Sequence, residues 1–88
     1  MNKETYALIT FKSTNFALLG EEIFKENSFV FKTIPTPRDV STSCGLSLLF
    51  FVDDIDKVKK LISEGNLNID SMYIYSKSSE GSFAEKIL

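Results

Sequence analysis

The feature that most constrains the fold is the order of two apolar patterns within only 88 residues. Runs rich in β-branched and aromatic residues predict four strands, and apolar residues at helical spacing predict two helices. The expected strands are Thr5–Phe11, Ser28–Ile34, Leu46–Val52 and Leu67–Tyr75, and the expected helices are Asn15–Glu26 and Asp54–Glu64. The sequence therefore predicts an α+β, ferredoxin-like βαββαβ domain, in which a four-stranded antiparallel sheet has both helices on one face.

The length of the chain is that of one domain. We expect this domain to span residues 4–76, because the apolar pattern continues to that point. From Ser76 onward the sequence becomes polar, so residues 77–88 are expected to form a polar C-terminal tail.

Composition excludes several classes of function. The net charge of −2, without clusters of Lys or Arg, argues against binding to nucleic acid or to anionic membranes. No apolar run approaches the roughly 20 residues of a membrane-spanning helix, and the first residues do not resemble a signal peptide. We therefore expect a cytoplasmic protein. The absence of histidine and the single cysteine predict neither a metal site nor an internal disulfide.

The segment Ile34–Gly45 is the candidate functional loop. It holds both prolines, Pro35 and Pro37, together with the only cysteine, Cys44. The prolines stiffen one side of the loop, and Gly45 leaves room for a ligand. Cations and helix N-termini favour the reactive thiolate of a cysteine over its thiol. The expected anion- and loop-binding residues around Cys44 are Lys12, Ser13, Thr14, Pro35, Pro37, Arg38, Ser41, Ser43 and Gly45.

The predicted topology indicates which segments lie beside this loop. The loop should lie at the same end of the sheet as the turn Lys12–Asn15 and the start of the first helix. The competing interpretation is that Cys44 packs as a small apolar residue, which is the commoner role of a lone cysteine. The sheet face opposite the helices is rich in Leu and Phe, which predicts homodimerisation through it (Tyr6, Leu8, Leu49 and Phe51).

Three short motifs resemble those of the selenium/sulfur carrier protein-like family, a small bacterial family. They are Phe11-Lys-Ser-Thr14, Ile34-Pro-Thr-Pro-Arg38 and Ser41-Thr-Ser-Cys-Gly45, and the resemblance covers roughly residues 5 to 75. It implies a cysteine that carries sulfur or selenium as a persulfide or selenosulfide. The family's cysteine falls on Cys44 and its arginine on Arg38.

The resemblance further implies partners that donate and accept the chalcogen, and no cofactor other than S or Se bound covalently to Cys44. A carrier or binding protein is expected rather than a stand-alone enzyme. The alternative is a regulatory module that binds a small molecule or a protein and in which Cys44 is structural.

Overall fold

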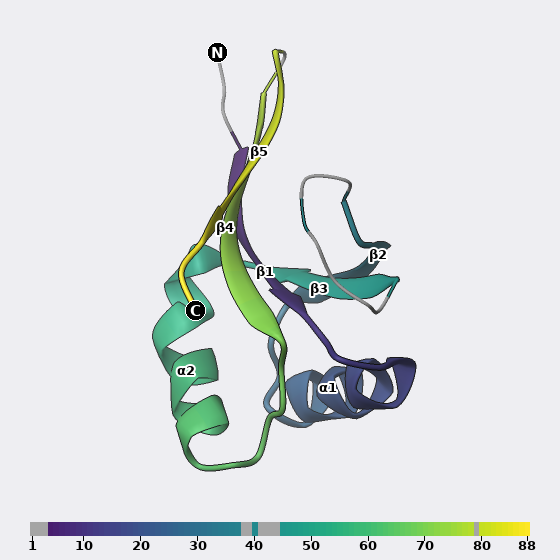
Figure 1. The fold of residues 1–88 in the computed structure, drawn as a ribbon. Helices are drawn as coiled ribbons and strands as arrows, with labels where there is room; N and C mark the ends of the chain where they lie inside the picture. The colour runs from purple at the N-terminus through teal and green to yellow at the C-terminus, as the bar shows by residue number, and fades with distance from the viewer. Residues whose placement is uncertain (1–3, 38–39, 41–44, 79) are drawn as a thin grey trace.

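The computed structural model describes residues 4–37, 40, 45–78 and 80–88. Along the chain, the strands are β1 (Glu4–Thr10), β2 (Phe31–Pro35), β3 (Leu46–Phe50), β4 (Ser71–Ser78) and β5 (Gly81–Lys86). The helices are α1 (Thr14–Glu26) and α2 (Ile55–Ser63), and a short 3-10 turn at Val52–Asp54 precedes α2 (Figure 1).

All five strands form one antiparallel sheet with the order β2-β3-β1-β4-β5. The expectation of a four-stranded sheet is wrong. Residues 81–86, expected within a polar tail, pair with β4 as an edge strand. The hairpin forms because Gly81 adopts a positive φ of 132°, which a residue without Cβ tolerates in a tight turn.

The end of the chain is also bound to the sheet. The N–H of Ile87 donates to the carbonyl of Met72 (2.8 Å), and Leu88 exchanges backbone hydrogen bonds with the same residue. The polar composition of residues 77–88 therefore reflects an exposed edge strand, since an edge needs polar side chains to stay soluble.

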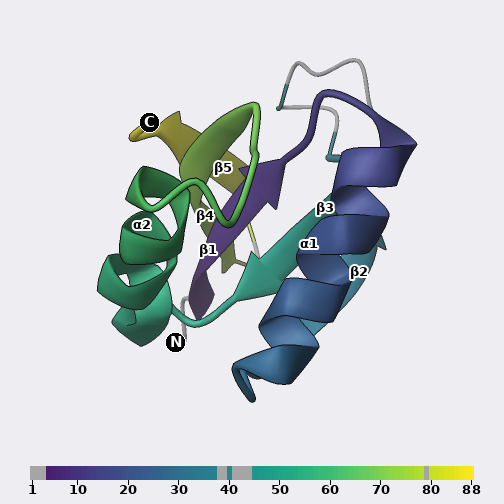
Figure 2. The same cartoon turned by 90° about the horizontal axis from the view of Figure 1, so that it is seen from below.

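Both helices lie on the same side of the sheet, as predicted (Figure 2). The strands alternate, so that Ala7 and Ile9 of β1 face the helices and Tyr6 and Leu8 face away. Phe24 of α1 is fully buried in the core cluster on the helix side. The opposite face is free of helices and is called the helix-free face below.

Helix α1 begins and packs for local reasons that the sequence contains. The Ser13 side chain accepts a hydrogen bond from the N–H of Phe16 (3.4 Å), which caps the first turn. Gly20 lies against Phe11, and a Cβ at Gly20 would approach the Phe11 ring to 2.7 Å. The glycine therefore lets the helix come closer to the end of β1 than any other residue would.

Two strands begin later than predicted. β2 begins at Phe31 and not at Ser28, because Ser28 adopts a φ of 60° that reverses the chain after α1. β4 begins at Ser71 and not at Leu67, although Leu67 is buried and contributes to the core from the preceding loop. Apolar residues alone did not distinguish a buried loop from a strand.

Candidate functional site

The loop that contains Cys44 joins β2 to β3 and is tied at its base. Pro35 and Leu46 form the last pair of the β2–β3 ladder. The N–H of Thr36 donates to the carbonyl of Gly45 (2.9 Å), and the Thr36 hydroxyl is 2.7 Å from that of Ser47. Both ends of the loop are therefore fixed to the sheet.

Val40 anchors the middle of the loop to the helix-free face. Its N–H donates to the carbonyl of Pro37 (3.1 Å), which closes a turn. Its side chain is buried against Leu8 and Tyr73. The sequence pattern had assigned Leu8 to an open face available for dimerisation, but Leu8 is fully buried. The chain covers part of this face with its own loop.

Three buried hydroxyl side chains lie on the sheet next to the base of the loop. Thr10, Ser47 and Ser71 are buried and belong to the face that lacks helices. The Thr10 hydroxyl donates to the carbonyl of Ser71 (3.4 Å) and accepts from its N–H (3.1 Å). Within the described part of the chain, every buried side-chain oxygen and nitrogen has a hydrogen-bond partner. Sequence analysis missed this cluster, although Ser47 within the apolar segment Leu46–Phe50 was a signal.

The turn between β1 and α1 leaves the sheet at the same end as this loop, as predicted. The β1–β3 ladder ends at the pair Thr10 and Ser47, and Lys12 and Gly45 each lie two residues beyond it. Lys12 and Thr14 are exposed. The Ser13 oxygen accepts the hydrogen bond that caps α1.

The remaining predicted site residues divide into two groups. Pro35 and Gly45 are exposed, and Pro37 is half-buried. The space where a Cβ of Gly45 would lie is open, with no atom within 4 Å. Four predicted residues lie outside the described residues, namely Arg38, Ser41, Ser43 and Cys44.

Neither a metal cluster nor a membrane span is found among the residues that the structure describes. No group of three or more His, Cys, Asp or Glu side chains is arranged there to hold a metal ion. No described helix has both the length and the apolar composition needed to cross a bilayer.

Comparison with known protein families identifies the family of the chain. The family described as "Putative Se/S carrier protein-like" matches residues 6–74, a range that runs from β1 into β4 and includes the whole loop. The chain belongs to this family. No curated protein and no solved structure matches the chain. Membership therefore connects the loop between β2 and β3 with a family named for carrying selenium or sulfur.

Proposed function

We propose that the protein carries sulfur or selenium on Cys44, as a persulfide or selenosulfide, from a donor protein to an acceptor protein. The observation that carries the proposal is the family match, which spans the loop holding the chain's only cysteine. A fixed loop base supports it, because a carrier must present its cargo in a defined position to two successive partners.

The transfer is an exchange between thiolates. The Cys44 thiolate attacks the outer sulfur of a donor persulfide, a new S–S bond forms on Cys44, and the donor's S–S bond breaks. The donor cysteine leaves as a thiolate, so that one sulfur atom moves and no external oxidant or reductant is needed. Passing the cargo on repeats the exchange with an acceptor thiolate. Selenium moves in the same way from a donor selenosulfide.

The surrounding residues have roles in this proposal. Arg38 and Lys12 stabilise the anionic chalcogen by their charge, and the backbone amides from Ser43 to Gly45 donate hydrogen bonds to it. Gly45 leaves space for the partner's cysteine to approach. Thr36 and Val40 keep the loop closed over the sheet, as positioning residues that do not touch the cargo.

The test is mass spectrometry of the intact protein after incubation with sodium polysulfide. We expect a gain of about 32 mass units for one sulfur atom on Cys44, through thiolate attack. Protein purified without reductant from cells grown on selenite should gain about 79 mass units when selenium is the cargo. The Cys44→Ser variant should gain nothing.

A matched control moves the thiol and keeps the cysteine count. The double variant Cys44→Ser, Ser63→Cys places one thiol at an exposed position on α2. We expect its loading at neutral pH to be slower by about tenfold, because Ser63 is the last residue of α2 and the negative end of a helix dipole disfavours a thiolate. Equal loading of both proteins would contradict a carrier loop. It would favour the alternative, a binding module in which Cys44 is structural.

A further inference from the structure

A groove with a volume of about 360 Å³ lies on the helix-free face, beside the part that Val40 covers. Tyr6 of β1, Leu49 of β3 and Tyr75 of β4 line it. Lys32 of β2 and Lys77 of β4 line it as well. Because β3 and β1 lie between β2 and β4, the two lysines come from opposite sides of the groove.

The floor of the groove is aromatic. Tyr6 and Tyr75 are direct partners in the β1–β4 register, and the ring of Phe51 is tilted against that of Tyr6, with centroids 6.3 Å apart. Phe51 is 48% exposed and Val30 is 64% exposed, so large apolar surfaces remain in contact with water here. Aromatic surfaces of this kind bind planar or aliphatic groups favourably.

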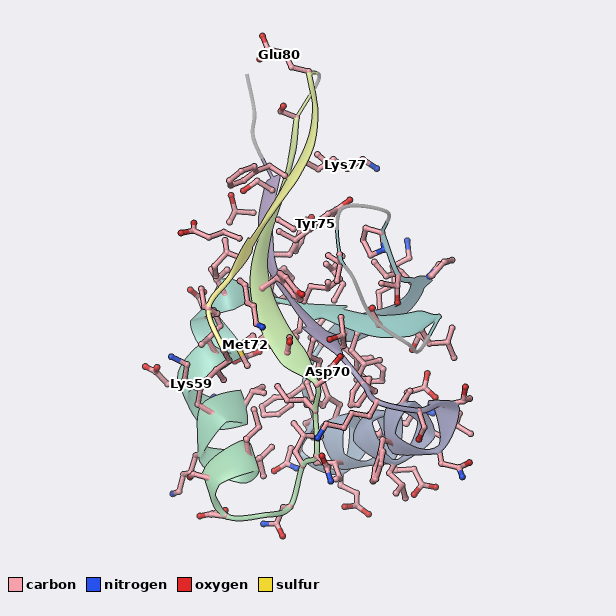
Figure 3. The ribbon with its side chains drawn as sticks, viewed as in Figure 1. Lys59, Asp70, Met72, Tyr75, Lys77 and Glu80 are labelled. Atoms are coloured by element: carbon pink, nitrogen blue, oxygen red, sulfur yellow. The ribbon has the colours of Figure 1, made fainter. Side chains whose placement is uncertain are left out.

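The charged residues that line the groove, among those the structure describes, are two lysines, in a chain whose net charge is −2. No acidic residue is among the described residues that line it. A salt bridge joins Lys57 to Asp54 near α2, and neither Lys32 nor Lys77 takes part in it. Figure 3 shows Lys77 and Tyr75 projecting from β4, far from Lys59 on α2.

We propose that this groove binds a small amphipathic organic anion. Its aromatic or aliphatic body lies on Tyr6, Leu49 and Tyr75, and its carboxylate or similar group interacts with one of the two lysines, Lys32 or Lys77, that flank the groove. The volume falls within the range of about 300–1,000 Å³ that is typical of ligand sites, and an apolar floor with few charged groups is their usual composition. The inference does not depend on the chemistry of Cys44.

The position of the groove connects it to the loop. Ile34, Leu49 and Tyr75 line the groove and also pack in the cluster that buries Val40. A bound ligand therefore touches the residues that hold the loop on the sheet. We expect the amide of Val40 to respond to binding, although Val40 does not line the groove.

The test is a titration of the full ¹⁵N-labelled chain with 3-phenylpropionate, followed by amide chemical shifts. We expect saturable shifts at Lys32, Leu49, Tyr75 and Lys77. Propionate, which lacks the ring, and 3-phenylpropylamine, which carries the opposite charge, should each bind at least about tenfold more weakly, because they keep only one of the two interactions.

Substitution of the lysines separates a charged site from a merely apolar one. The Lys32→Gln, Lys77→Gln double variant should bind 3-phenylpropionate about tenfold more weakly, while the Lys59→Gln, Lys60→Gln control on α2 binds as the parent does. All these lysines are exposed, so each variant is expected to fold, and its amide spectrum verifies this.

Three results would overturn the proposal. The first is equal binding of the anionic and the cationic probe. The second is unchanged affinity in the Lys32→Gln, Lys77→Gln variant. The third is a set of groove shifts that depends on protein concentration without ligand, because a second copy of the chain would then occupy the groove.

Discussion

The two faces of the single sheet differ in what covers them. On the helix side, Phe24 meets Phe29, Phe31 and Phe50 edge to face, with centroids 5.0, 5.5 and 5.3 Å apart. On the helix-free face, Val40 from the loop is buried against the strands, and another part of the surface opens into the groove.

The difference indicates that the two faces of the sheet have different roles. Two amphipathic helices bury a continuous apolar cluster, which supplies most of the stability available to a chain of this size. The helix-free face contributes less to stability, and it holds the loop and the groove where binding can occur. We therefore expect substitutions on the helix side to affect folding, and those on the other face to affect function.

The largest effect is expected from Phe24→Ala. It removes a fully buried ring from three aromatic neighbours and leaves a cavity, so the free energy of unfolding should fall by about 3–5 kcal/mol. Urea unfolding followed by circular dichroism measures this loss. Should the variant fail to fold, Phe24→Leu should still fold and lose less. A loss below 1 kcal/mol for Phe24→Ala would contradict the division between the faces.

Gly20→Ala tests the close contact of α1 with the sheet. Alanine favours helix by about 1 kcal/mol over glycine, but its Cβ would approach the Phe11 ring to 2.7 Å. We expect the clash to dominate, with a net loss of about 1–2 kcal/mol in the free energy of unfolding. Gly45→Ala is the matched control, since its Cβ would meet nothing within 4 Å. A more stable Gly20→Ala protein would show that α1 can move away at no cost.

Val40→Ala sharpens the comparison on the helix-free face. It removes two methyl groups that are buried against Leu8 and Tyr73, which should cost about 1–2 kcal/mol of unfolding free energy. The rate of Cys44 alkylation by iodoacetamide should also change, since the loop loses its anchor. An unchanged rate would mean that Val40 does not position the loop.

The smallest effect is expected from Thr36→Val. The exchange removes the hydroxyl that is 2.7 Å from the Ser47 hydroxyl and leaves Ser47 buried with one partner fewer. The free energy of unfolding should fall by about 1 kcal/mol. Thr14→Val, at an exposed threonine on α1, is the control. A difference between the two variants of less than 0.3 kcal/mol would be below the usual value of such a bond.

Much of the fold could be predicted from single residues and their spacing. Ser13 before Phe16 is a local signal for the start of α1, and Gly20 within its apolar stripe is a local signal for its close approach to the sheet. Strand β5 could not be predicted, because its polar residues carry no alternating pattern and it forms only by pairing with β4. Of the candidate site, the shared end of Lys12 and Gly45 followed from the strand order.

The groove and the anchoring of the loop could not be predicted. Val40 has no sequence signal that distinguishes it from any apolar loop residue, and its partners Leu8 and Tyr73 lie far from it in the chain. Lys32 and Lys77 are likewise distant in sequence, and only the pairing of four strands brings them to one groove.

The sequence by itself determined the two helices, the approximate positions of four strands and where the cysteine lies, because these follow from local spacing and from the residues that begin and end each element. Only the tertiary structure decided that the loop folds back onto the sheet through Val40, that β5 extends the sheet, and that two lysines share one groove. Each of these depends on contacts between residues far apart in the chain, whose energies local patterns do not contain.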